Sequence, residues 1–519
     1  MINNKRNNHG FANSTTNKPQ TNHKDANSRN ELAQIVASLI TEGKLSEAEA
    51  ICTKLISKGA REYTAYTDLA AIRCIQDRHN EAFKLLKQAA ILNPNSHKIY
   101  YNLGVASEKI KDVKFAIKAY KQSLKINQDN TKAYTNLGKA LAETGDTQAA
   151  ICTYQTALKI NPKDSAIYMN LGNAYAQEGS MMDACVSYKK SLELNPDNPE
   201  TNWNLSLAML LNGDFENGWE AYEWRLRRSK SNMKIHAFPQ CKQWEGEPLT
   251  QNAKLLLITE QGLGDTLQFM RFANAFKNRG FDVSICAQPK LHGLIKASEI
   301  SVSPLSPLEA NQEKEGYWLP LLSAPKHLEV NPNNPLVSTP YIKTNCELIS
   351  KWKDLLSTES KPIIGINWQG NPETEKTGLK GRSLPLKSFS KIASNPNISF
   401  LSLQKGFGSD QLQKCPFKEK FVKCQSQIND TWDFLETAAI IANCDLIVTS
   451  DTAVAHLAGG LGKPTWLLLH HVPDWRWGLE GENTFWYPSM RLFRQQKKGD
   501  WKSVINRVDE SLKTHFSQF

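Results

Sequence analysis

The segment AYTNLGKALAETGDTQAAICTYQTALKINPKD, residues 133–164, decides the fold of the N-terminal half of the chain. Apolar residues recur in it at helical spacing in two stretches, and a turn at Gly145 separates them. The segments that begin at Tyr100 and Ile167 align with it without a gap, and equivalent positions in the three segments are 34 residues apart. This pattern predicts pairs of helices stacked in a regular array.

Two residue types mark the repeat most clearly. Asparagine and tyrosine recur at the repeat spacing, at Asn102, Asn136, Asn170 and Asn204 and at Tyr120, Tyr154, Tyr188 and Tyr222. The pattern resembles the tetratricopeptide repeat, in which small residues let paired helices pack closely and a proline ends the second helix. The resemblance implies an α-solenoid of about six repeats over residues 31–230.

The concave face of such a solenoid is expected to bind a protein partner or acceptor. We expect its groove to be lined by the asparagine ladder, Asn102, Asn136, Asn170 and Asn204. An asparagine amide offers one acceptor and two donors, so a row of them can hold the backbone of an extended chain. The O-linked N-acetylglucosamine transferases, which resemble this chain in their repeats, carry a similar ladder. The alternative is that these asparagines bond only to the neighbouring repeat.

The composition points to a cytoplasmic protein. Residues 1–30 are rich in Asn, Thr, Ser and Lys and lack the apolar core of a secretory signal, so we expect a disordered tail. No apolar stretch approaches the roughly 18 to 20 residues that span a bilayer. The ten cysteines include no Cys-x-x-Cys pair, which favours free thiols in a reducing compartment over disulfides or zinc.

The net charge of +11 does not by itself indicate nucleic acid. The lysines are spread along the chain, and the densest stripe, from Lys109 to Lys125, has the spacing of a solvated helix face. The sequence lacks the aromatic or arginine-rich interleaving that is typical of nucleic-acid binding. We therefore expect no nucleic-acid partner.

From residue 250 the pattern changes, and short Leu, Ile and Val runs alternate with helical segments. This alternation predicts an α/β fold with parallel sheets covered on both faces. We expect two Rossmann-like halves, 250–345 and 346–519, after a linker at 231–249, because residues 305–335 break the rhythm. The expected strands are 254–259, 281–287, 363–368, 398–403, 445–450 and 465–469.

Two motifs follow expected strands, where ligands of open α/β sheets bind. The first runs from Glu260 to Asp265, and its glycines, Gly262 and Gly264, are expected to let the backbone turn tightly and a ligand approach. The second is SDTAVAHLAGGLGKP, residues 450–464. Dinucleotide binding is not expected at the first motif, because the third glycine of Gly-x-Gly-x-x-Gly is absent.

Both motifs also admit a structural interpretation. The alternative for Asp265 is a role as helix cap alone. In the second motif the apolar spacing turns Val454 and its periodic partners to the core, so Thr452 and His456 share the other face at the positive end of the helix. Anion binding is expected there. The alternative is that Asp451 caps the helix and that His456 is satisfied in the interior.

Taken together, five motifs carry a resemblance to a known family. They are EQGLGDTLQFMRF (260–272), GINWQGNP (365–372) with GRSLPL (381–386), FLSLQKG (400–406), SDTAVAHLAGGLGKPTWLLL (450–469) and PDWRWGLEGENTFWYPSMRLFRQ (473–495). In this order they resemble the bacterial tetratricopeptide-repeat glycosyltransferases related to the lipopolysaccharide heptosyltransferases. The resemblance implies a GT-B fold and inverting sugar transfer from a nucleotide sugar, with no cofactor and no metal. The chain contains no Asp-x-Asp, which agrees with metal-free transfer.

The resemblance also assigns roles to residues. The aspartate of the family's Gly-x-Gly-Asp motif is the general base, which places that role on Asp265. The Asp-Thr-x-x-x-His segment meets the donor diphosphate, which places Asp451, Thr452 and His456 there. The chain departs from the heptosyltransferases at Ala453, where they carry glycine.

Without a metal, protein cations and helix N–H groups must stabilise the departing diphosphate. The candidate cations are Lys405 and Arg382, together with the segment around His456. Trp368, Gln369 and Asn371 follow an expected strand and are expected to line the donor cleft.

Two functions therefore stay open. The first is an inverting, metal-independent glycosyltransferase whose acceptor is a protein or a cell-surface glycan, with the repeats recruiting the acceptor or a partner. The second is a repeat scaffold whose transferase domain is inactive or only binds a nucleotide sugar. Asp265, Asp451, Thr452 and His456 are all present, and their retention together favours activity.

Overall fold

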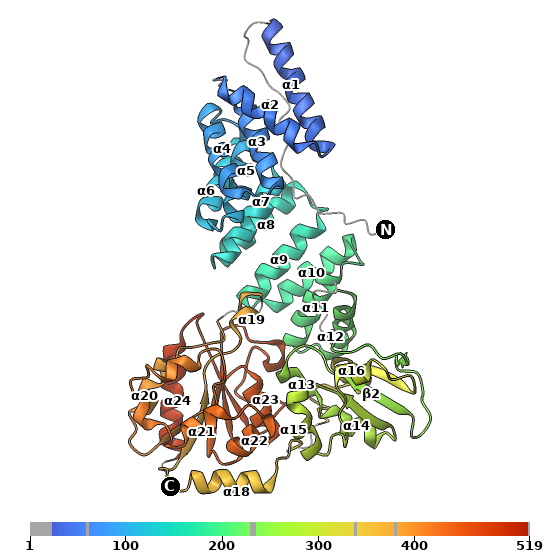
Figure 1. The fold of residues 1–519 in the computed structure, drawn as a ribbon, viewed down its shortest axis with the longest axis vertical. Coiled ribbons are helices and arrows are strands. Elements are labelled where there is room, and N and C mark those ends of the chain that lie inside the picture. Colours follow the sequence, from blue (N-terminus) through green and yellow to red (C-terminus); the bar gives the residue numbers. More distant parts are fainter. Residues whose placement is uncertain (1–22, 59–61, 229–234, 337–339, 378–380, 517–519) are drawn as a thin grey trace. The chain divides into compact units, whose positions relative to one another are not determined.

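The structure of the chain is a computed structural model that describes residues 23–58, 62–228, 235–336, 340–377 and 381–516 (Figure 1). The chain divides into two compact units, residues 1–197 and 198–519. The first unit is helical, and the second holds two parallel sheets together with the last pair of repeat helices.

The described residues of the first unit form ten helices, blue to green in Figure 1, which pack as successive pairs. They are α1 (His23–Thr41), α2 (Leu45–Ser57), α3 (Tyr63–Ile75), α4 (His79–Leu92), α5 (His97–Lys109), α6 (Val113–Ile126), α7 (Thr131–Glu143), α8 (Thr147–Ile160), α9 (Ser165–Glu178) and α10 (Met181–Leu194). Helix α1 begins at His23, eight residues before the predicted start of the array at residue 31, so the predicted disordered tail is wrong over residues 23–30. The rest of the predicted tail, residues 1–22, lies outside the described residues.

The repeating tyrosines explain why glycine recurs in the first helix of the central repeats. A Cβ atom placed on Gly104, Gly138 or Gly172 would lie less than 3.0 Å from the ring of the tyrosine sixteen positions later. These rings, Tyr120, Tyr154 and Tyr188, are buried between the paired helices. Glycine therefore sets the distance between the two helices of a repeat. Side-chain carboxylates start several of these helices, as Asp112 and Asp146 do for α6 and α8.

Replacing Gly138 with alanine should destabilise the repeats. Overpacking against the Tyr154 ring costs about 1 to 3 kcal/mol, which outweighs a gain of about 1 kcal/mol in helix propensity. Urea unfolding of the full chain, followed by circular dichroism, should show an earlier helical transition. Lys132→Ala, at an exposed position of the same helix, is the control and should leave the transition in place. An unshifted transition in Gly138→Ala would mean that the ring moves aside without cost.

Two parallel sheets make up the core of the second unit, which confirms the predicted α/β arrangement. The first has the order β1-β4-β2-β3 and the second β6-β5-β7-β8-β9. Their strands are β1 (Lys242–Gln243), β2 (Lys254–Ile258), β3 (Asp282–Cys286), β4 (Tyr317–Pro320), β5 (Ile363–Asn367), β6 (Ser399–Ser402), β7 (Leu446–Ser450), β8 (Thr465–Leu469) and β9 (Met490–Arg494). All six predicted strands are present, and β1, β4 and β9 were not predicted.

Short helices follow most strands and cover the sheets. Those used below are α13 (Leu263–Phe269) after β2, α19 (Pro372–Thr377) after β5 and α23 (Ala453–Gly460) after β7. The others are α14 (Phe272–Asn278), α15 (His292–Ala297), α16 (Pro307–Ala310), α17 (Ala324–His327), α18 (Cys346–Leu355), α20 (Ser390–Ala393), α21 (Gln425–Asp430), α22 (Phe434–Ala442) and α24 (Trp501–His515).

The last repeat helices, α11 (Pro199–Leu211) and α12 (Phe215–Tyr222), belong to the second unit. Just after them, Arg225 donates two hydrogen bonds of 2.9 Å to the carboxylate of Glu260, and both side chains are buried. Trp219 of α12 packs edge-on against Trp475, with ring centroids 5.3 Å apart. The predicted domain boundary at residue 230 is therefore wrong, because buried polar and aromatic contacts tie α11 and α12 to the sheets.

The predicted linker at 231–249 is also wrong over its described part. Residues 242–243 form β1 and pair with β4. Ala237 and Trp244 are buried, so this segment belongs to the core of the second unit. The predicted residues 231–234 lie outside the described residues.

Candidate functional site

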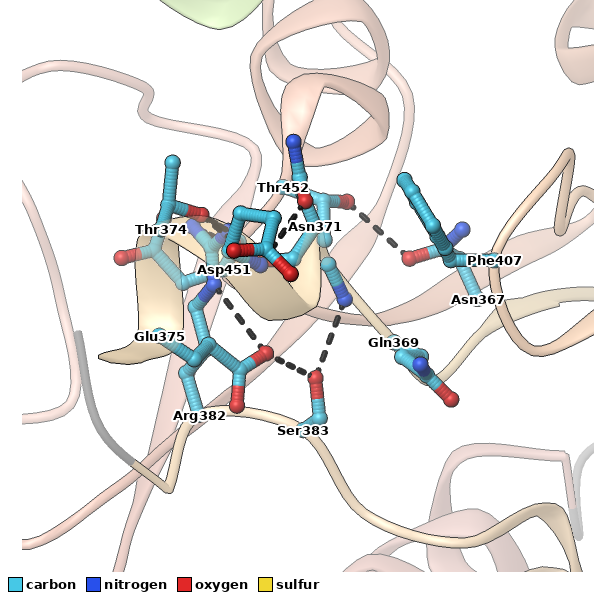
Figure 2. Close-up of polar contacts among 12 residues, drawn as sticks. Asn367, Gln369, Asn371, Thr374, Glu375, Arg382, Ser383, Phe407, Asp451 and Thr452 are labelled. Carbon is cyan, nitrogen blue, oxygen red and sulfur yellow. Dashed lines mark hydrogen bonds and ion pairs between the residues drawn. The ribbon is translucent and has the colours of Figure 1, made fainter. Parts of the chain in front are cut away.

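The candidate site lies at the carboxyl edge of the second sheet, where β5 and β7 end. The hydroxyl of Thr452, at the start of α23, donates to Oδ1 of Asn367, the last residue of β5, over 3.0 Å. Figure 2 shows this pair beside Arg382 and Asp451, on loops that follow neighbouring strands. The structure thus brings the 365–386 and 450–456 motifs together, as expected for parallel strands.

The glycine motif at residues 260–265 lies next to this edge because the helix that it opens, α13, packs against α23. Helix α13 packs against α23, and a Cβ on Gly264 would lie 3.1 Å from Cδ2 of His456 and 3.5 Å from Cα of Ala453. Gly264 therefore lets the two helices approach, rather than a ligand. The N–H of Gly262 donates to Asp265 Oδ2 over 2.8 Å, so Asp265 does cap α13.

Arg476 is the residue that sequence reasoning missed. Its guanidinium donates to Asp265, to the side-chain oxygen of Gln268 and, over 2.8 Å, to Asp474. Arg476 lies in the quoted motif PDWRWG, but its partners are up to 211 positions away, so no local pattern identified its role. Burial raises the pKa of Asp265 above its usual range, and the Arg476 charge opposes that rise.

Asp451 is buried, and its side chain interacts with the indole of Trp477. Its backbone oxygen accepts a hydrogen bond of 3.1 Å from Arg382. Burial, helped by the nearby charge of Asp474, raises the pKa of Asp451 to about 6, although Arg382 opposes the shift. Asp451 does not cap α23, because Thr452 occupies the N-cap position. The capping alternative for Asp451 is therefore wrong.

His456 is satisfied in the interior. Its Nδ1 lies 2.9 Å from the hydroxyl of Tyr487, and its ring stacks on Trp477 at 5.5 Å. Burial lowers the pKa of His456 well below its usual range, and Arg476 and Arg271 lower it further. The histidine is therefore neutral at pH 7, and its predicted place beside the donor diphosphate stays a prediction.

Arg382 is the one predicted cation whose guanidinium lies at the edge defined by Asp451 and Thr452. It bonds to the backbone of Asp451 and, over 2.9 Å, to the hydroxyl of Thr374 in α19. Glu375 of the same helix lies 3.6 Å from its Nε. A Cβ on Gly370 would collide with this guanidinium, so that glycine gives Arg382 its place against the backbone.

Lys405 lies after β6, and its ammonium is occupied elsewhere. It donates to the backbone oxygen of Ile428 and to the hydroxyl of Thr431. Burial lowers the pKa of Lys405 to about 8. These bonds give Lys405 a structural role in holding the 428–431 segment, and they compete with its predicted contact with a diphosphate.

The three residues expected to line a donor cleft behave differently. Trp368 is fully buried in the core of the second sheet, so the prediction for it is wrong. Gln369 is half-buried, and its amide oxygen accepts a hydrogen bond of 3.0 Å from Gln411. Asn371 is exposed, and its side chain accepts from the N–H of Glu373 at the start of α19.

Two of the four asparagines of the ladder are buried, and the other two are partly exposed. Asn102 and Asn170 are less than 10% exposed, and each carries one buried amide atom with no hydrogen-bond partner among the described residues. Asn136 donates to the hydroxyl of Tyr101 in the preceding repeat over 3.3 Å, which favours the inter-repeat alternative at that position. Asn204 lies in α11, in the second unit.

Three of the expected absences can be compared with the described part of the chain. Within the described ranges no group of three His, Cys, Asp or Glu side chains is arranged to hold a metal ion. No helix there is long and apolar enough to cross a membrane. All ten cysteines are free.

Comparison with known proteins identifies the repeats. Residues 112–145, 138–179 and 172–213 match the family model of the TPR repeat, which confirms the tetratricopeptide prediction for this part of the chain. Protein FlbA of Caulobacter vibrioides is 24% identical over 328 residues, 58% of this chain and 53% of FlbA. The chain thus spans about half the length of that relative.

Solved structures also resemble part of the chain. The TPR protein YrrB is 20% identical with a TM-score of 0.31, over 34% of this chain and 94% of YrrB. MamA from Desulfovibrio magneticus RS-1 is 19% identical with a TM-score of 0.30, over 31% of this chain and 91% of MamA.

The negative charge of Asp451 should lower the free energy of unfolding. Because the pKa of Asp451 is raised in the folded protein, stability is lost as the pH rises from about 4, the ordinary pKa of aspartate, through about 6. Asp451→Asn should therefore raise the melting temperature at pH 8 and change it little at pH 4. Differential scanning fluorimetry in matched buffers measures both.

Asp474→Asn is the matched control with the opposite sign. The Asp474 carboxylate pairs with Arg476 at 2.8 Å, so its loss should lower the melting temperature at pH 8. A lower melting temperature for Asp451→Asn at pH 8 would contradict the prediction and show that the Asp451 charge is well compensated.

Proposed function

We propose that the chain is an inverting, metal-independent glycosyltransferase that moves a sugar from a nucleotide-sugar donor to a protein or cell-surface glycan acceptor. The observation that carries the proposal is the place of Asp265. It lies in α13, after the first sheet, and α13 packs against α23 at the carboxyl edge of the second sheet. A carboxylate with a raised pKa lies there within one cluster with Arg476, Asp474 and the N-terminal end of α23. The motif resemblance to repeat-bearing glycosyltransferases supports it.

Asp265 acts as the general base in this proposal. Inverting transfer needs a carboxylate that takes the proton of the acceptor hydroxyl as the hydroxyl oxygen attacks the sugar. The Gly262 N–H and the Arg476 guanidinium fix the Asp265 carboxylate in one orientation. Burial makes this carboxylate more basic than an exposed aspartate, and so better matched to a hydroxyl proton.

The departing nucleotide diphosphate is stabilised by Arg382 and by the start of α23. Thr452 caps α23 without a side-chain hydrogen bond to its N–H groups, so a bound anion can accept from them. Arg476 is less suited to the task, because Asp265 and Asp474 already balance its charge. His456 is neutral and acts by holding α23 through Tyr487.

The repeats recruit a protein, either as acceptor or as partner. The match to the TPR repeat supports a role in protein interaction. A scaffold without catalysis is the second candidate, and one observation favours it. Both carboxylate oxygens of Asp265 already accept hydrogen bonds within the protein, as they would in a residue that only caps and pairs.

Asp265→Asn separates these two functions. A panel of nucleotide sugars tested by thermal shift identifies the donor, and turnover is then measured with that donor. The variant should lose at least about a hundredfold in turnover, with donor affinity little changed. Asparagine keeps an oxygen that can accept from the Gly262 N–H, so the cap survives. Unchanged turnover with a lower melting temperature would favour the scaffold.

Arg382 and Lys405 form a matched pair for the diphosphate. Arg382→Gln should weaken binding of the free nucleoside diphosphate by about ten- to a hundredfold, as expected for a lost charged hydrogen bond. Nucleoside binding should not change. Lys405→Gln should leave both affinities within about threefold, because its ammonium bonds to the 428–431 segment. Isothermal titration calorimetry measures these affinities, and a larger loss for Lys405→Gln would reverse the assignment.

A further inference from the structure

At the carboxyl ends of three strands of the second sheet lie buried polar side-chain atoms that have no hydrogen-bond partner among the described residues. Ser450 Oγ ends β7, His470 Nδ1 follows β8 and Gln495 Nε2 follows β9. Each residue is at least nine-tenths buried, and none of these three atoms has a hydrogen-bond partner among the described residues. Natural proteins pair most buried polar groups, so three such atoms on adjacent strand ends call for a physical account.

The three residues share one face of the sheet. Side chains alternate along a strand, and Val448, Leu468 and Phe493, two positions earlier on each strand, belong to the same apolar core cluster. Ser450 pairs in register with Leu468, and the Gln495 N–H continues the ladder by donating to Leu469. The three side chains therefore form a group on one face at the ends of three adjacent strands, called the row below. Gln495 follows the strand next to His470, and Ser450 is set back by two residues, beside Leu468.

The row is fixed rather than adaptable. The N–H of Gly499 donates to Oε1 of Gln495 over 2.9 Å, which fixes the amide, while its Nε2 has no hydrogen-bond partner among the described residues. Burial lowers the pKa of His470 to about 4, so the ring is neutral at pH 7. Beside the row, the Asp451 carboxylate and the Trp477 indole are likewise buried, and they interact with each other.

We propose that Ser450, His470 and Gln495 bind hydroxyl groups of the donor sugar, an inference that rests on the proposed transferase function. The row and its neighbours offer donors, acceptors and groups that do both. Sugar hydroxyls also donate and accept, so they can satisfy every member. A phosphate oxygen only accepts, and the carboxylate of Asp451 beside the row would repel it. The row therefore suits the sugar rather than the diphosphate.

His470→Phe tests this assignment, since it keeps a planar ring and removes the nitrogens. The dissociation constants of UDP-, GDP-, ADP- and CMP-linked sugars are measured by calorimetry on the full chain, each beside its free nucleotide. For any sugar nucleotide that wild type binds more tightly than the nucleotide, the variant should lose at least about tenfold. Affinity for the free nucleotide should not change. Gln495→Leu should behave in the same way.

His471→Phe is the matched control, because this neighbouring histidine is exposed and its Nδ1 lies 3.4 Å from the Gln495 backbone oxygen. It should keep the wild-type ratio of affinities. Melting temperature adds a second readout: His470→Phe should melt no earlier than wild type, because it removes a buried polar atom that has no partner.

The outcomes separate the two proposals. If wild type binds a sugar nucleotide more tightly than its nucleotide and His470→Phe keeps that ratio, the sugar assignment is wrong while the transferase proposal stands. If His470→Phe also melts earlier, the row holds structural water. If wild type binds sugar nucleotides no more tightly than the free nucleotides, the sugar assignment alone is contradicted. If it binds no sugar nucleotide at all, both proposals are contradicted.

Discussion

The position of Asp265 depends on one buried cation. Arg476 joins α13, which follows the first sheet, to the loop that follows β8 in the second, through Asp265, Gln268 and Asp474. A buried guanidinium is tolerated only when its hydrogen bonds are made, and removal of one partner of such a pair typically costs about 3 to 5 kcal/mol. The close packing of Gly264 against α23 and the fixed orientation of the Asp265 carboxylate both follow from this junction.

Periodicity explains how much of the fold could be predicted. The repeats were predictable because each unit makes the same local contacts, such as Gly138 against Tyr154. Six strands were predictable because they are continuous apolar runs. Strand β4 was missed because Tyr317–Pro320 is short and ends in proline, and β9 because Arg491 and Arg494 interrupt its apolar residues.

The candidate site was predictable as a place, but not in the state of its groups. The predicted strand ends and helix starts located the loops that form the candidate site, because parallel strands bring their carboxyl ends together at one edge of the sheet. Burial keeps His456 neutral and removes Trp368 from the surface. Burial itself depends on residues far along the chain, such as Tyr487 beside His456 and Gly408 beside Trp368. Arg476 and the row at His470 could not be predicted either, because their surroundings also depend on residues distant in the sequence.

The contacts around Trp219 and Arg225 limit how this architecture can be divided or recombined. A fragment that begins at Asn198 keeps the Arg225–Glu260 pair and the packing of Trp219 on Trp475. A fragment that begins after Arg228 leaves Glu260 buried without its cation and uncovers Trp475, one residue from Arg476. Repeats can therefore be exchanged between such proteins only upstream of α11, and the last helix pair is inherited with the sheets.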